Sequence, residues 1–131
     1  MAKSFSMESL NAAQRRAVQT LQGPVLILAG AGTGKTRTVT CRIAHMVDKG
    51  ISPKSILAVT FTNKAALEMR ERVGQMVDRK AARQIMVSTF HSLCVRILRE
   101  DIGRLGYKTN FTIYSGSEQS GLIRRLIVRH G

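Results

Sequence analysis

The segment that most constrains this chain is residues 25–36, where an apolar run gives way to glycines and closes on Gly-Lys-Thr. Val25–Leu28 predicts a buried strand, and the glycines after it permit a tight turn whose backbone N–H groups close around phosphate oxygens. A helix predicted from Lys35 onward adds the positive end of its dipole to the same place. In such a phosphate-binding loop Lys35 reaches the β- and γ-phosphates, and the Thr36 hydroxyl ligates Mg²⁺. The sequence therefore predicts a site for a nucleoside triphosphate.

One position departs from the strict form of this loop. Ala29 stands where the pattern has its first glycine, and alanine suits the turn if φ stays negative there. A glycine-rich turn without a ligand is the alternative, but the strand-like run before the loop and the helical run after it argue against it. The predicted nucleotide contacts within the loop are Ala29, Gly30, Ala31, Gly32, Thr33, Gly34, Lys35 and Thr36.

Length and charge bound the partners. With 131 residues the chain is predicted to be one domain with a core of its own. Its 21 Lys and Arg against 8 Asp and Glu give a net charge of +13, which favours a polyanionic partner such as nucleic acid. The alternative is that compensating acidic surface lies elsewhere in a longer protein.

Cysteine usage and hydropathy indicate the compartment. Cys41 and Cys94 each lie in a helical pattern among apolar neighbours, which suits reduced packing residues, and their spacing fits no metal motif. No apolar stretch approaches the length that spans a membrane, and residues 1–10 lack the apolar core of a signal peptide. The sequence predicts a soluble, cytoplasmic protein without a membrane partner.

Helical and strand patterns alternate along the chain. Asn11 is predicted to cap the first helix and Asn63 the third, while Ser117 opens the last. Helices are predicted over 12–20, 35–48, 63–77, 90–102 and 118–129, and strands over 25–28, 56–60, 85–88 and 111–114. The inward residues of the 90–102 helix are predicted to be Leu93, Cys94, Ile97, Leu98 and Ile102, and those of the last helix Leu122, Ile123, Leu126 and Ile127.

This order predicts an α/β fold with a parallel sheet flanked by helices. Ligands of such sheets gather at the carboxyl ends of the strands. The 56–60 strand is followed by Phe61, Thr62, Asn63 and Lys64, where the ring could stack on a base while the polar groups hold phosphates. Packing of Phe61 in the core, with Asn63 acting only as a cap, is an equally open alternative.

A similar cluster follows the 85–88 strand. It contains Thr89, Phe90 and His91. His91 has no carboxylate or nucleophile near it in sequence, so a hydrogen-bonded structural role is favoured over catalysis for this residue.

Taken together, these segments resemble the opening motifs of superfamily 1 DNA helicases of the UvrD/Rep/PcrA type. The resemblance runs through nearly the whole chain in the family's order, and Ala29 is the residue that family carries. The segments are Leu10-Asn11 with Gln14, Ala29–Thr36, Thr60–Ala66 with Glu68-Met69, and Ser88–His91.

The resemblance implies roles for individual residues. It implies that Gln14 recognises adenine of ATP, that Lys35 and Thr36 bind phosphate and Mg²⁺, and that Arg37 lies close to the nucleotide. It also implies that Phe61–Lys64 contact single-stranded DNA and that Thr89–His91 lie along the same path. Gln14 could instead serve as the capping-box partner of Asn11, three residues earlier, or fill both roles; the resemblance favours adenine.

The eight acidic residues bear on catalysis. Phosphoryl transfer to water needs a carboxylate at Mg²⁺, and none of the eight follows an apolar strand as that family's metal-holding pair does. The resemblance therefore implies a piece of a larger helicase that is inactive alone. Residues 1–116 would be the first part of a RecA-like P-loop NTPase domain, and residues 117–131 the start of an inserted helical subdomain.

Such a piece is expected to leave apolar sheet surface open and so to self-associate or be marginally stable. Its parent would couple ATP hydrolysis to 3′–5′ movement on single-stranded DNA and to unwinding at duplex junctions. The alternatives are a stand-alone P-loop module or kinase without DNA function, and a basic nucleic-acid-binding domain with a vestigial loop. Loss of nucleotide binding on Lys35→Ala would argue against the latter.

Overall fold

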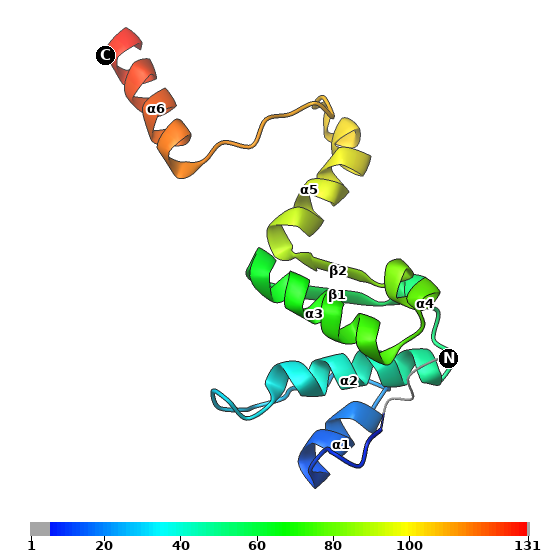
Figure 1. Cartoon of the computed structure of the whole chain (residues 1–131). Coiled ribbons are helices and arrows are strands. Elements are labelled where there is room, and N and C mark those ends of the chain that lie inside the picture. The colour runs from blue at the N-terminus through cyan, green and yellow to red at the C-terminus, as the bar shows by residue number, and fades with distance from the viewer. Residues whose placement is uncertain (1–5, 131) are drawn as a thin grey trace. The chain divides into compact units, whose positions relative to one another are not determined.

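The computed structural model, drawn in Figure 1, describes residues 6–130. The chain divides into two compact units: the first ends at Leu93 and the second begins at Cys94. In chain order, the first unit contains helices α1 (Ala12–Gln19) and α2 (Lys35–Asp48), the 3₁₀ turn η1 (Pro53–Ser55), strand β1 (Leu57–Thr60), helices α3 (Asn63–Met76) and α4 (Arg79–Gln84), strand β2 (Met86–Thr89) and the start of α5 (Phe90–Asp101). The rest of α5, the 3₁₀ turn η2 (Ile102–Leu105) and α6 (Gly116–His130) belong to the second unit.

The sheet of the first unit has two parallel strands in direct register. Leu57 is opposite Met86 and Thr60 opposite Thr89, so both strands end at the same edge. The α/β class with a parallel sheet flanked by helices is confirmed, and β1 and β2 match the expected strands to within a residue at each end.

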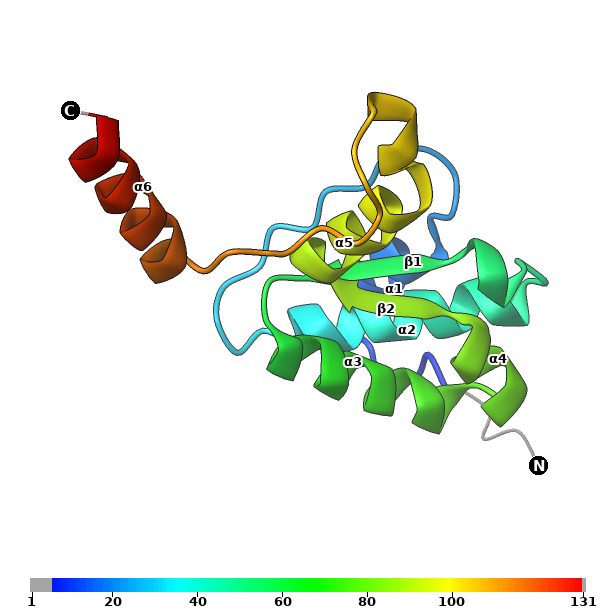
Figure 2. The ribbon, with the colours of Figure 1, turned by 90° about the horizontal axis from the view of Figure 1, so that it is seen from above.

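Helices α2 and α3 cover one face of this sheet (Figures 1 and 2). Successive side chains of a strand point to opposite faces, so the buried Ala58 and Val87 share the face against the helices. The core there consists of Ile43, Ile56, Ala58, Ala66, Met69, Val73, Ile85 and Val87. On the opposite face Leu57 remains 49% exposed, so one side of the sheet carries the core.

A smaller cluster fastens α1 to α2. Leu10, Val18 and Cys41 are buried together, which confirms Cys41 as a packing residue. Burial raises the pKa of the Cys41 thiol, and the positive charge and hydrogen bond of Arg37 oppose that rise. Arg42 of α2 also hydrogen-bonds to the α1 region, because its guanidinium donates to the carbonyl oxygens of Ala17, at 2.5 Å, and Thr20.

The expected strands at 25–28 and 111–114 are wrong: neither segment is a strand in the part of the chain the structure describes. Leu26 and Leu28 are 82% and 86% exposed, and Ile113 is 62% exposed. A strand requires a neighbour to accept and donate its ladder hydrogen bonds. Neither segment pairs with β1 or β2, and most of their apolar side chains stay exposed to solvent.

The five predicted helices are present, but their caps and first residues differ in places, and one further helix was not predicted. Thr62, not Asn63, caps α3, because its Oγ1 accepts from the Ala65 N–H at 3.1 Å. Helix α4 was not predicted, although Asp78 caps it by accepting from the N–H groups of Lys80 and Ala81, each at 2.9 Å. Helix α6 begins two residues earlier than expected, at Gly116, and Ser115 rather than Ser117 exchanges hydrogen bonds with Glu118.

The inward faces predicted for the last two helices are also wrong. No residue of α5 or α6 is buried, and Cys94 is exposed. The predicted inward residues Ile97 and Ile127 are 51% and 63% exposed. The apolar periodicity formed helices as expected, but most of the predicted inward side chains remain exposed.

Candidate nucleotide and strand-end sites

Glycines shape the turn between residue 29 and helix α2. Gly32 and Gly34 have φ of 75° and 87°, in the left-handed region where a Cβ is strained. The Thr33 hydroxyl donates to the Gly30 carbonyl oxygen at 2.7 Å, which closes the turn on itself. The chain therefore enters α2 through a compact loop, as the glycine spacing predicted.

The Lys35 side chain folds back over this loop. Its Nζ donates to the carbonyl oxygens of Ala29, at 2.9 Å, and Gly30, at 2.7 Å. Both contacts are exposed, so the ammonium group is held above the turn and open to solvent. The cation sits where the first turn of α2 begins.

The start of α2 has unsatisfied donors. Gly34 is the N-cap and has no side chain, so no side-chain group caps this helix. The first N–H groups of a helix have no partner within it, and they attract anions together with the helix dipole. Lys35 adds a full positive charge at this point, and the first turn contains no acidic residue.

Gln14 joins helix α1 to the loop. Its N–H donates to Asn11 Oδ1 at 2.9 Å and its Oε1 accepts from the Asn11 N–H at 3.1 Å, which completes a capping box. Its Nε2 donates to the Thr33 carbonyl oxygen at 3.1 Å. The predicted cap role of Gln14 is confirmed, and the same amide also lies against the loop. A Cβ added at Gly34 would come within 3.1 Å of Nε2, so the approach is close.

These parts enclose a pocket of about 320 Å³. That volume is at the lower end of the range for small-molecule pockets. Its walls are Asn11, Ala13, Gln14 and Ala17 of the α1 segment, Ile27, Leu28, Ala29, Gly30 and Thr33 of the loop segment, and Lys35 and Thr38 of α2. The sequence did not predict a place in this site for six of the lining residues: Asn11, Ala13, Ala17, Ile27, Leu28 and Thr38. The small residues Ala13 and Ala17, one turn apart on α1, were the available signal.

Five predicted residues of this region do not line the pocket: Ala31, Gly32, Gly34, Thr36 and Arg37. Thr36 is exposed in the first turn of α2, and Arg37 donates through Nη2 to Ser9 Oγ at 2.5 Å. Within residues 6–130, no group of three or more His, Cys, Asp or Glu side chains could hold a metal ion.

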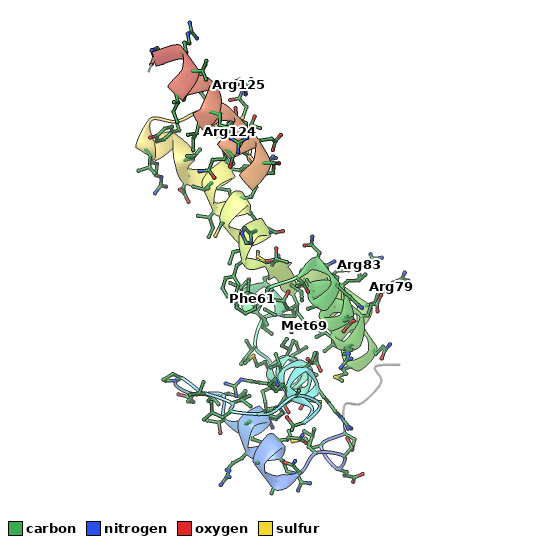
Figure 3. The ribbon with its side chains drawn as sticks, turned by 90° about the vertical axis from the view of Figure 1, so that its left-hand side faces the viewer. Phe61, Met69, Arg79, Arg83, Arg124 and Arg125 are labelled. Atoms are coloured by element: carbon green, nitrogen blue, oxygen red, sulfur yellow. The ribbon has the colours of Figure 1, made fainter. Side chains whose placement is uncertain are left out.

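A second cluster, here called the strand-end cluster, forms where β1 and β2 end side by side. It contains Phe61–Lys64 and Thr89–His91. The rings of Phe61 and Phe90 lie with centroids 5.4 Å apart and an interplanar angle of 46°. They are 87% and 47% exposed, so the alternative that packs Phe61 in the core is wrong. Figure 3 shows Phe61 together with Met69, whose side chain is buried on α3. The register of the strands therefore creates an exposed aromatic pair.

Hydroxyl groups fix the backbone around this pair. Thr60 Oγ1 donates to the Thr62 carbonyl oxygen at 3.1 Å, and Thr89 Oγ1 accepts from the Ser92 N–H at 3.2 Å. Thr60 and Thr89 are buried, whereas Asn63, Lys64 and His91 are exposed. The structure thus brings the two predicted strand-end segments together, with rings and polar groups facing solvent.

No described helix is long and apolar enough to cross a membrane.

Comparison with known proteins shows the family of the chain. Residues 10–130 match the family described as UvrD/REP helicase N-terminal domain. The chain is 56% identical over 119 residues to the ATP-dependent DNA helicase PcrA of Leuconostoc citreum, which covers 90% of this chain and 16% of that protein. It is 51% identical over 122 residues to the proteins of the same name in Staphylococcus epidermidis and Staphylococcus aureus, covering 92% of this chain and 17% of each relative. The chain belongs to the UvrD/REP helicase N-terminal domain family.

Proposed function

We propose that this chain is the ATP-binding segment of an ATP-dependent DNA helicase. The observation that carries the proposal is the loop after residue 29, where Lys35, the uncapped start of α2 and Gln14 converge on one pocket. Family membership supports it, and the most similar relatives carry the name ATP-dependent DNA helicase. The chain spans about 16–17% of the length of those relatives, so the activity belongs to the whole protein.

The residues present fit a nucleoside triphosphate. The glycines with positive φ keep side chains out of the turn, so backbone N–H groups can approach phosphate oxygens. Lys35 exchanges its two carbonyl contacts for the β- and γ-phosphates, which costs little because both contacts are exposed. Bound ATP with Mg²⁺ would supply the phosphoryl group that is transferred to water.

Thr36 and Arg37 act beside the phosphates. The Thr36 hydroxyl would hold Mg²⁺, an ion that keeps several waters and needs few protein ligands. Arg37, tied to Ser9 in this structure, stays within the first turn of α2 and adds positive charge near the nucleotide. Lys35 and Thr36 would be the catalytic residues of this segment, Lys35 by contacting the reacting phosphates and Thr36 by holding the Mg²⁺ bound to them.

Gln14 reads the base. Its amide can accept from and donate to adenine, but both of its groups are already paired with Asn11 and Thr33. Adenine therefore competes with the capping box and the loop contact for the same amide. Adenine binding in the pocket should then weaken the hydrogen bond from Gln14 Nε2 to the Thr33 carbonyl oxygen.

The strand-end cluster binds single-stranded DNA. The exposed rings of Phe61 and Phe90 offer stacking platforms, and Lys64 with the start of α3 offers charge for phosphates. Thr62, Asn63, Thr89 and His91 provide further polar contacts along the same edge. In the whole protein, ATP hydrolysis would be coupled to 3′–5′ translocation and to unwinding at duplex junctions. Residues 1–116 would belong to the RecA-like P-loop domain and residues 117–131 to an inserted helical subdomain.

Titration with a fluorescent ATP analogue and Mg²⁺ tests the proposal. Wild-type chain and the Lys35→Ala variant are compared, with hydrolysis followed in parallel and with single-stranded DNA added. Weaker binding by the variant, without turnover in either protein, supports a nucleotide-binding segment that needs the rest of the helicase for catalysis. Equal binding by both proteins would contradict it, and DNA-stimulated turnover would show that a catalytic carboxylate already lies in this chain.

A further inference from the structure

Helix α4 lies at the end of the sheet opposite the aromatic pair. It comes directly before β2 and packs against η1, which comes before β1 (Figure 1). Both elements therefore lie at the amino ends of the parallel strands. Four strand residues, about 13 Å of chain, separate this end from Phe61 and Phe90. Whatever binds at α4 uses a surface distinct from the strand-end cluster.

This end of the first unit carries a cationic surface formed by Arg79, Lys80, Arg83 and Gln84, here called the α4 surface. The four residues line a hollow of about 370 Å³. Arg79 and Arg83 are one helical turn apart and so share a side of α4, and Figure 3 shows both projecting from the same end of the unit. The adjoining turn η1 adds Lys54.

Nothing in the described structure neutralises these charges. Within residues 6–130, the ion pairs are Arg96 with Glu100 and Arg104 with Asp101, and neither involves α4. The neighbouring carboxylate, Asp78, is engaged as the helix cap. The guanidinium groups of Arg79 and Arg83 are thus exposed and open to an anion.

Helix stability does not account for the cations. Of the α4 side chains, Ala81 alone is buried, so Arg79, Lys80 and Arg83 contribute nothing to the core. Arg79 and Lys80 lie in the first turn, where the positive end of the helix dipole disfavours cations. Arg83 lies in the last turn, where the helix dipole favours a cation, but nothing in the helix favours Arg79 and Lys80 at its start.

We propose that the α4 surface binds the phosphate backbone of a nucleic acid, as a second contact separate from the strand-end cluster. Guanidinium groups match phosphate oxygens in a two-pronged geometry. The α4 surface has no aromatic or large apolar side chain, so it lacks both a platform for stacking bases and the anchors typical of a protein interface. Binding is therefore sequence-independent and governed by salt.

The inference rests on the proposed function in that the nucleic acid is the strand or duplex on which the helicase acts. Fluorescence anisotropy of labelled single-stranded and duplex 20-base DNA (roughly twice the ~10 bp helical turn), titrated with the 131-residue chain at several salt concentrations, tests it. The test variant is Arg79→Gln with Arg83→Gln. The matched control is Arg124→Gln with Arg125→Gln on α6, which removes the same charge from another exposed surface (Figure 3).

The test variant is expected to bind duplex DNA more weakly and to lower the slope of log K against log salt by about 1.8, since each phosphate contact contributes about 0.9. A second variant, Arg79→Lys with Arg83→Lys, should restore most of that slope because it keeps the charge. An unchanged slope in the test variant, or an equal change in the control, would overturn the proposal and leave the surface for an acidic protein. Phe61→Ala, measured on single-stranded DNA, reports the strand-end cluster independently, so failure of one site is distinguishable from failure of the other.

Discussion

Helices α3 and α6 both carry an apolar stripe, but the stripe is buried in α3 and exposed in α6. In α3 the stripe of Ala66, Met69 and Val73 is buried against the sheet and α2. In α6 Ile123 and Leu126 are three residues apart, as Ala66 and Met69 are, but remain 50% and 47% exposed. The pattern determines which face of a helix is apolar, whereas burial depends on whether another element lies against it.

Residues 25–28 extend the comparison to strands. Val25, Leu26 and Leu28 form an apolar run as suitable for a strand as Leu57–Thr60, yet only the latter has a hydrogen-bonded neighbour. The first unit therefore combines a closed core on one face of its sheet with apolar chain left open elsewhere. The difference between the two regions lies in partners rather than in composition.

The largest effect expected from this difference concerns association. Exposed apolar segments in the first unit and on α6 should drive the isolated chain to self-associate at micromolar concentration. Light scattering across a dilution series measures it, with Leu26→Ser and Leu28→Ser together expected to shift the mass toward monomer. A monomer at every concentration, with a cooperative melt well above room temperature, would count against the prediction.

The next effect separates the two helical stripes by stability. Met69→Ala should lower the free energy of unfolding by about 2–5 kcal/mol, because it leaves a cavity in the core. Ile127→Ala should change it by less than about 0.5 kcal/mol, since that side chain is mostly in water. Urea denaturation followed by circular dichroism compares them. Equal losses would mean that the α6 stripe is buried in solution.

The smallest effect is a pH dependence at the start of α6. Hydrogen bonds from the Ser115 hydroxyl and N–H to Glu118 hold the pKa of that carboxyl below its ordinary value of 4.5. A carboxyl whose pKa is lowered in the folded state stabilises that state above its ordinary pKa, and the contribution disappears as the pH falls through the folded pKa. The first turn of α6 should therefore fray in acid. The amide shift of Ser115, followed by NMR, reports it, and a Glu118→Ala chain whose Ser115 amide titrates as in the wild type would refute the link.

Local chemistry made much of this molecule predictable. The glycine spacing before Lys35 and the capping pair Asn11 and Gln14 depend on neighbours a few residues apart, and both formed as expected. The strand-end aromatic pair was foreseen as two separate segments, since parallel strands of similar length end at one edge. Contact between the Gln14 amide and Thr33 joins residues 19 positions apart, which no local pattern encodes.

The predictions that were wrong concerned strand pairing and burial, which depend on segments distant in sequence. The strands at 25–28 and 111–114 and the inward faces of α5 and α6 were inferred from apolar residues alone, and burial requires a second surface. Helix α4 was missed because its six residues include one buried position, Ala81, and so show no periodicity. Its cap, Asp78, was the one local signal.

The central claim is that the loop after Ala29, with Gln14, binds the nucleotide. The most direct measurement is a ¹⁵N–¹H NMR titration of the chain with Mg²⁺ and a non-hydrolysable ATP analogue. If the loop and Gln14 bind the nucleotide, amide shifts are expected at Gly30–Thr36 and at the Gln14 side-chain amide, with none along α4. Shifts confined to other residues, or no change at Gly30–Thr36 under saturating analogue, would contradict it.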